Sequence, residues 1–355
     1  MKPGATLLPI VLLTIACTHP QAVSSPNDSN VADRVQVRLV RDEAEAALAI
    51  LNARARRASV PESAWSKLFA TEGYRLLKAR EAAMGRAFDD PAFRAFMESD
   101  TLLQRVTELR AAVERWRTID VTSAARRALA YLPAHARIRV SLIPMIKPIT
   151  NSFVYQSDST LAMLIYIDPR STPAQIENTL AHELHHIGYG TACSGPPRTD
   201  LPESVRTARL YTGAFGEGLA MLAAAGGPSI HPHALSDTAD RNRWDREVGN
   251  IDRDLRSVER FLLDVADARI VARDSIQQMA MKFFGVQGPW YTVGWRMAVT
   301  IEQEFGKARL LEVMCDPAGF LATYNEAAAK NNARLPRSTL PLWSQELLTK
   351  LRVGH

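Results

Sequence analysis

The sequence has no long run of basic residues, although its 43 lysines and arginines outnumber its 38 aspartates and glutamates and give a net charge of +5. This mild excess is spread along the chain. A nucleic-acid partner needs a concentrated basic stripe, so the distribution argues against nucleic-acid binding. No internal repeat is visible. With 355 residues, of which 46% are hydrophobic and 23% charged, the chain has the composition of an ordinary globular protein with a sizeable core.

The N-terminal apolar stretch, residues 6–16, carries no charge but is too short to cross a bilayer as a stable helix. Lys2 precedes it and small residues end it, which is the layout of a secretory signal. The segment Leu13-Thr14-Ile15-Ala16-Cys17 resembles the lipobox of bacterial lipoproteins, in which the cysteine is lipidated. We therefore expect residues 1–16 to be a signal peptide and Cys17 to carry a lipid anchor, with an ordinary signal peptide cut nearby as the alternative. Because Thr18 and not aspartate follows, the resemblance implies the outer membrane, with the protein facing the periplasm or the exterior.

Cysteine is scarce, with three residues in the whole chain. If Cys17 carries lipid, Cys193 and Cys315 are left as a pair. In an exported, oxidising compartment two such thiols tend to be joined, so we expect a disulfide between them. Two separate buried thiols are the alternative.

The rest of the chain changes character near residue 136. Residues 17–35 are polar and rich in Ser, Pro and Asn, which predicts a flexible tether to the membrane. Residues 36–135 place apolar side chains at helical spacing and carry no chemical motif, so they predict a helical scaffold. Alternation from residue 137 to 143, followed by two more apolar segments up to residue 167, predicts strands. The predicted fold class is α+β, mostly helical with a small mixed β-sheet.

The most informative helix follows these strands. Thr172 can cap its N-terminus, a proline suits its first turn, and Gln175 can complete a capping box. The pattern predicts a helix over residues 173–187, which Gly188 and Gly190 would end.

This helix carries the segment His182-Glu183-Leu184-His185-His186, an HExxH motif. His182 and His186 are four residues apart, so they lie on one helix face and can converge on one Zn²⁺. Glu183 lies beside the metal, where it can take a proton from the zinc-bound water. The alternative is a solvated, histidine-rich helix end. His185 points elsewhere, and we expect it to be a structural polar residue or a hydrogen-bond donor behind the site.

A catalytic zinc needs a third protein ligand and an open position. Glu217 is the preferred candidate, because small residues surround it in Gly216-Glu217-Gly218 and let its helix approach the first one closely. Two rivals are Glu203, at a predicted helix start, and His231, in a predicted loop.

The HELHH segment followed downstream by Glu217-Gly218-Leu219-Ala220 resembles the gluzincin branch of the zincin metallopeptidases, and more closely bacterial families described only as zinc-dependent peptidases. The resemblance covers about residues 135–335 and implies a zincin-like domain over residues 136–355. It also implies one zinc per chain on His182, His186 and Glu217, with Glu183 as general acid and base. The spacing from the motif to Glu217 is longer than in thermolysin. The chain also lacks the Gly-x-Met-Glu-Asn element of the aminopeptidase relatives.

The transition state of peptide hydrolysis needs a second donor for its oxyanion. Tyr291, near a predicted helix start after Gly288-Pro289, is the candidate; the alternative is a core role shared with Trp290 and Trp295. The strand segment 152–166 could supply the edge on which an extended peptide pairs.

The sequence therefore predicts a monomeric cell-envelope lipoprotein that hydrolyses peptide bonds of a peptide or protein substrate with a water activated by zinc and Glu183. One alternative is a zinc hydrolase acting on a cell-wall amide or another small substrate. Another is a non-catalytic zinc-binding lipoprotein, which the free glutamate beside the histidines disfavours.

Overall fold

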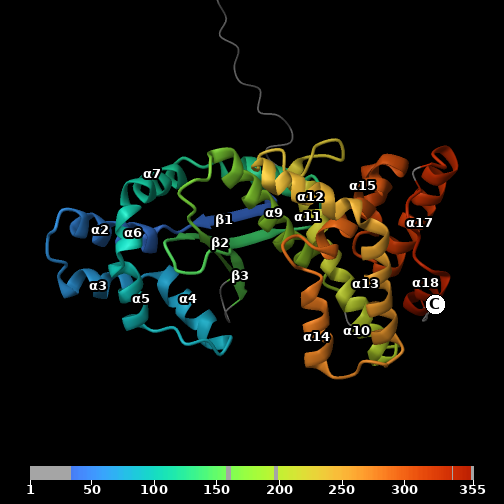
Figure 1. Ribbon diagram of the computed structural model, residues 1–355, viewed down its shortest axis with the longest axis horizontal. Coiled ribbons are helices and arrows are strands. Elements are labelled where there is room, and N and C mark those ends of the chain that lie inside the picture. Colours follow the sequence, from blue (N-terminus) through green and yellow to red (C-terminus); the bar gives the residue numbers. More distant parts are fainter. Residues whose placement is uncertain (1–32, 157–160, 196–198, 338, 353–355) are drawn as a thin grey trace, which may run out of the picture.

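The structure is a computed structural model that describes residues 33–156, 161–195, 199–337 and 339–352. The predicted signal peptide, Cys17 and the tether up to residue 32 lie outside the described residues. In Figure 1 the N-terminal helices, in blue, lie to the left of a central sheet, and the C-terminal helices, in yellow to red, lie to its right. No helix in the described ranges combines the length and the apolar character that crossing a membrane requires.

The sheet has four strands in the order β1-β2-β4-β3. β2 (Ile138–Met145) lies parallel to both β1 (Val35–Leu39) and β4 (Leu161–Tyr166). β3 (Phe153–Gln156) pairs antiparallel with β4 and forms one edge. β2 is buried along nearly its whole length, since it lies between two strands and helices of both the N-terminal and the C-terminal region contact it. The small mixed sheet in a mostly helical chain agrees with the predicted α+β class.

β1 was not predicted, and the helical prediction was wrong for residues 36–39. Its alternating burial is that of a strand, but five residues between a polar segment and an Ala- and Glu-rich one are too few to show a period. Only pairing with β2, far along the chain, stabilises it as a strand. This pairing places the start of the N-terminal region in the same sheet as the strands of the predicted zincin-like region.

Seven helices of the N-terminal region follow β1 among the described residues: α2 (Asp42–Ala55), α3 (Glu62–Phe69), α4 (Glu72–Ala83), α5 (Asp90–Glu98), α6 (Asp100–Gln104), α7 (Val106–Arg117) and α8 (Val121–Leu129). The cap of α5 is typical of how local sequence sets these boundaries. Asp89 accepts a hydrogen bond from the backbone N–H of Ala92, and a proline occupies the first turn.

The C-terminal helices are α9 (Pro173–Ala192), α10 (Glu203–Thr212), α11 (Gly216–Ala225), α12 (Thr238–Gly249), α13 (Ile251–Ala266), α14 (Arg273–Lys282), α15 (Pro289–Phe305), α16 (Lys307–Val313), α17 (Pro317–Arg334) and α18 (Gln345–Arg352). A short 3₁₀ turn, Gly213–Phe215, leads into α11. α11 packs between α9 and α15, and this arrangement brings distant parts of the chain together at one site.

The start of α9 agrees with its prediction, but its end does not. The Thr172 side chain accepts a hydrogen bond from the backbone of Gln175, and the Gln175 side chain accepts one from the backbone of Thr172, so the capping box is present. The helix then continues through Gly188 and Gly190 to Ala192. A Cβ atom on Gly188 would lie 2.2 Å from Leu132 Cδ1. Gly188 therefore serves close packing and not termination.

Candidate metal centre

Three side chains from two helices converge at one point. The Nε2 atoms of His182 and His186, both on α9, lie 3.0 Å apart. The Oε2 atom of Glu217, on α11, lies 3.0 Å from Nε2 of His186 and 3.3 Å from Nε2 of His182. Of the described residues, these three form the one group of His, Cys, Asp and Glu side chains that is close enough to hold a metal ion together.

The donor set fits zinc. Zinc binds His nitrogen and carboxylate oxygen at about 2.0–2.2 Å, and three donor atoms about 3 Å apart leave a point at that distance from all of them. Two imidazoles and one carboxylate are a zinc donor set, and three protein ligands leave one position for water or substrate. The side chains are partly accessible, with exposed fractions of 14% for His182, 26% for His186 and 17% for Glu217, so a substrate can reach the site.

The electrostatics of Glu217 suit a metal ligand. Burial alone would raise its pKa, but the hydrogen bonds from His182 and His186 outweigh burial and hold the pKa well below its ordinary range. Burial likewise disfavours the charged form of His186, and the neighbouring Glu217 and Glu183 carboxylates reverse this and raise its pKa. The group therefore presents an anionic carboxylate to a cation.

Glycines set the position of Glu217, although not in the way predicted. A Cβ atom on Gly216 would be in ordinary contact, 3.5 Å, with the Tyr189 ring of α9. A Cβ atom on Gly218 would lie 1.9 Å from the backbone nitrogen of Trp295. Gly218 therefore permits close approach to α15 and not to α9, where we had expected it.

Tyr291 lies next to the group formed by His182, His186 and Glu217. It is in the first turn of α15, and its ring is stacked on that of His182 with 6.3 Å between the centroids. Burial first, and then the negative charges of Glu217 and Glu183, raise the pKa of Tyr291 far above its ordinary value. The phenol therefore stays protonated and can donate a hydrogen bond. The two tryptophans near Tyr291 do belong to the core: Trp290 is buried in it, and Trp295 packs against it.

Glu183 is partly buried. Unlike His182 and His186, the other two residues of the motif, it does not belong to the group of metal donors. Its charge nevertheless acts on both His186 and Tyr291, which places it on the metal side of α9.

His185 points away from the His182, His186 and Glu217 side chains, into the core. It is fully buried, and burial lowers its pKa to about 3, so the ring is neutral. Its Nε2 lies 3.1 Å from the carbonyl oxygen of Tyr131, to which it donates as the neutral tautomer. The structural role that we expected for His185 agrees with this contact, which joins α9 to the chain segment after α8.

The rival ligands lie elsewhere. Glu203 begins α10 and lines a separate cavity with residues such as Val265 and Ile270. His231 Nε2 lies 3.0 Å from a carboxylate oxygen of Asp245.

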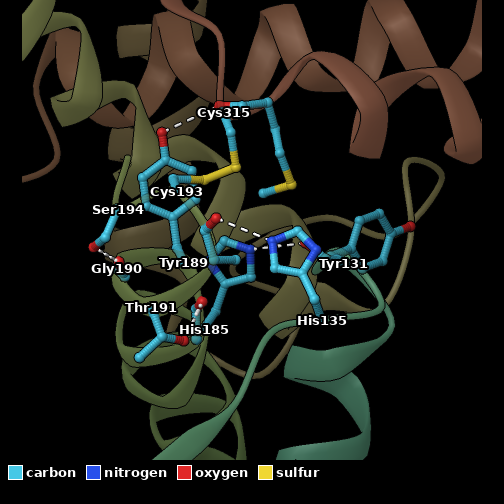
Figure 2. Close-up of a disulfide and its surroundings, with 12 residues drawn as sticks. Tyr131, His135, His185, Tyr189, Gly190, Thr191, Cys193, Ser194 and Cys315 are labelled. Carbon is cyan, nitrogen blue, oxygen red and sulfur yellow. Dashed lines mark hydrogen bonds between the residues drawn. A yellow bond between two sulfur atoms is a disulfide. The ribbon is translucent and has the colours of Figure 1, made fainter. Parts of the chain in front are cut away.

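The disulfide predicted between Cys193 and Cys315 is present in the structure. Figure 2 shows it beside Tyr189, whose hydroxyl donates to the carbonyl oxygen of Met314. The bridge fastens the C-terminal end of α9 to the segment between α16 and α17. Two cavities adjoin the N-terminal half of α9, and both are lined by Thr179, one turn before His182.

The cavity that contains His182 and Tyr291 measures about 340 Å³. It includes two residues that the sequence analysis missed, His233 and Gln287. In the segment His231-Pro232-His233, the sequence makes only His231 a candidate ligand. No sequence signal distinguishes Gln287.

The fold and the site thus define a mixed α+β protein with a His-His-Glu group, on two packed helices, whose spacing could hold a metal ion. Residues 65–333 match the model of the family DUF5700, described as "putative zinc dependent peptidase", and the chain belongs to this family. Neither curated proteins nor solved structures give a significant match to the chain.

Proposed function

We propose that the protein is a gluzincin-type zinc peptidase in which His182, His186 and Glu217 bind the metal. The observation that carries the proposal is the convergence of these three donor atoms within 3.3 Å of one another. Membership of a family described as zinc-dependent peptidases supports it.

An enzymatic role is favoured over a structural zinc site. Structural zinc sites are usually closed by four protein ligands, whereas three ligands of this kind are typical of catalytic sites. Beside the group lie an additional carboxylate, Glu183, and a protonated phenol, Tyr291, and both are groups that hydrolysis can use.

Zinc, when bound here, supplies a Lewis acid that acidifies water and polarises the substrate carbonyl. Glu183 accepts the proton of the attacking water and delivers it to the leaving amine nitrogen. Tyr291 keeps its proton and donates a hydrogen bond from its hydroxyl to the oxygen of the former carbonyl, on which negative charge develops. Glu217 and the two histidines keep their positions throughout, because α9 and α11 are packed against each other.

The substrate path follows the first part of α9. A polar cavity of about 480 Å³ is lined by Ser152, Tyr166 and Thr179, and so connects the β3–β4 end of the sheet to the turn before His182. β3 is an edge strand whose Val154 is exposed. An extended peptide that pairs with such an edge has its backbone held while side chains remain free to enter cavities.

We also propose that the enzyme works in the cell envelope as a lipoprotein anchored through Cys17. The lipobox-like sequence supports this location. The Cys193–Cys315 bridge supports it as well, because disulfides persist mainly in exported, oxidising compartments.

The test is a matched set of variants in purified protein that starts after the predicted signal. We expect wild-type protein to contain about one zinc and to hydrolyse peptides. Glu183→Gln should keep the zinc and lower kcat/KM about 100-fold or more. Glu217→Ala should lose most of the zinc, while the control Glu203→Ala should keep both zinc and activity. Full activity in Glu183→Gln, or full zinc occupancy in Glu217→Ala, would contradict the proposal.

A further inference from the structure

The cavity of about 480 Å³ beside the first turns of α9 carries a surplus of positive charge. Arg105 and Arg170 line it, whereas Asp168 is the single acidic residue among its described lining residues. Arg115 lies directly behind the turn that holds Asp168, because its guanidinium donates to the carbonyl oxygen of Pro169. In the described ranges Arg115 forms no ion pair. Three guanidinium groups therefore lie in or behind the wall of this cavity, against one carboxylate.

The carboxylate of Asp168 is already engaged, and the guanidinium of Arg105 is not. A carboxylate oxygen of Asp168 accepts a hydrogen bond from the backbone N–H of Arg170 at 3.0 Å and lies 3.6 Å from Nε of that arginine. Within the described chain, Arg105 meets one carboxylate, that of Glu108 at 3.9 Å, and the Glu108 side chain is 61% exposed. An exposed ion pair of this length contributes little stability. The Arg105 guanidinium is therefore available to an anionic ligand.

The opposite wall of the cavity is fixed by a buried lysine. Lys147 is 1% exposed, and its Nζ donates to the carbonyl oxygens of Ile149 at 2.7 Å and Asn151 at 2.5 Å. These bonds hold the loop between β2 and β3, which contributes Thr150 and Ser152 to the cavity. A wall that is ordered before the ligand arrives loses little conformational entropy on binding.

The cavity lies within reach of the metal group formed by His182, His186 and Glu217. Thr179 lines this cavity and also the one that contains His182, so the two adjoin each other. Along α9, Thr179 precedes His182 by three residues, a rise of about 4.5 Å. One residue of an extended peptide spans about 3.3 Å. A substrate carbonyl at the metal group therefore places a side chain one or two residues away at this cavity.

We propose that this cavity is a carboxylate-binding subsite of the peptidase proposed above. It selects substrates that carry an acidic side chain, or a free C-terminal carboxylate, one or two residues from the scissile bond. The planar guanidinium of Arg105 donates hydrogen bonds to the carboxylate oxygens, and Arg170 adds a second positive charge at the mouth of the cavity. A neutral side chain gains no ion pair there, and a basic side chain is repelled.

The test uses quenched fluorogenic peptides and charge variants of Arg105. One set of peptides has an amidated C-terminus and carries Glu, Gln or Lys in turn at the two positions on each side of the scissile bond. A second set carries Gln and ends in a free carboxylate at the same positions. Arg105→Gln removes the charge and keeps much of the aliphatic stem, and Arg105→Glu reverses the charge. The matched control is Arg273→Gln, at the exposed first residue of α14.

We expect wild-type protein to cleave its preferred carboxylate peptide about 10-fold better in kcat/KM than the amidated Gln peptide, mainly through a lower KM. Preference for the Glu side chain or for the free C-terminus identifies which carboxylate is bound. Arg105→Gln should reduce the preference to about threefold or less without loss of zinc, Arg105→Glu should favour the Lys peptide, and Arg273→Gln should retain the wild-type preference. About 0.5 M salt should weaken the preference, since partly exposed charges are screened.

Equal kcat/KM for carboxylate and Gln peptides in wild-type protein, or a preference that survives intact in Arg105→Gln, would overturn the proposal. If none of the peptides is cleaved, the peptidase function fails, and the subsite is tested by binding. Calorimetric titration of the zinc-loaded protein should then still show tighter binding of a carboxylate peptide than of the amidated Gln peptide, and Arg105→Gln should abolish the difference. Equal affinities in wild-type protein would refute the subsite independently of catalysis.

Discussion

Replacement of Gly218 by alanine tests how the two halves of the site are held together. In the structure the new Cβ atom would lie 1.9 Å from the backbone nitrogen of Trp295 and 2.3 Å from the carbonyl carbon of Gly294. Carbon atoms pack at about 3.5–4 Å, so α11 and α15 would have to separate by roughly 1.5 Å. The obstacle is helix backbone, which cannot move aside as a flexible side chain can.

Overpacking of a core usually costs about 1–3 kcal/mol, and a clash with backbone lies at the upper end, so we expect Gly218→Ala to lose about 3 kcal/mol of folding free energy. The same displacement separates Glu217 on α11 from Tyr291 on α15. A shift of about 1 Å at a catalytic site costs about 100-fold in rate, so activity should fall by at least that factor even in the folded fraction.

Gly216→Ala is the matched control. Its Cβ atom would be 3.5 Å from the Tyr189 ring, an ordinary contact, and Gly216 has helical backbone angles. Alanine in a helix is favoured over glycine by about 0.5–1 kcal/mol, so this variant should be neutral or slightly more stable. Urea unfolding of both zinc-loaded variants, followed by circular dichroism, measures the difference. A Gly218→Ala variant within about 0.5 kcal/mol of wild type would refute the packing argument.

Three further outcomes are expected. Replacing Cys193 and Cys315 by serine should lower the free energy of unfolding by about 2–5 kcal/mol, because the bridge closes a loop with a sequence separation of 122. Unfolding of the oxidised wild type and of the variant measures this difference, and a loss below about 1 kcal/mol would contradict the prediction. Burial raises the pKa of Glu43 from 4.5 to about 8, so the folded state holds a proton that the unfolded state releases, and stability should fall as pH rises from about 4.5 towards 8. Glu43→Gln, which can still accept the hydrogen bond from Ile146 N–H, should flatten that slope in unfolding experiments across this range, and an unchanged slope would assign it to other groups. Tyr291→Phe should lower kcat more than it changes KM, and unchanged kinetics would leave Tyr291 a packing role only.

Sequence reasoning succeeded where the structure is local. The capping box of Thr172 and Gln175 depends on residues within one helical turn, and so does the shared face of His182 and His186. Backbone hydrogen bonds between residues four apart determine these relations, whatever the rest of the protein does. The mixed α+β class also followed from local period and composition.

Glycine shows where local reasoning fails. Gly188 is typical of a helix stop, yet α9 continues through it, and the residue is glycine because Leu132 packs where a side chain would be. Gly218 was interpreted correctly as a close-approach residue, but its partner is α15 and not α9. A glycine within a helix indicates that another element packs closely against that helix, but it does not indicate which element. β1 is a similar case, since its strand conformation depends on a partner far away in the chain.

By itself, the sequence determined that two histidines and a glutamate lie on one helix. It also offered a candidate carboxylate ligand downstream and two cysteines that can pair. Only the tertiary structure decided that Glu217, and neither Glu203 nor His231, meets His182 and His186, and that His233 and Gln287 face the same cavity. The physical reason is that helix propensity and spacing act over a few residues, whereas the approach of α9, α11 and α15 depends on the fit of all their contacting side chains at once. That fit has no signature in any single segment.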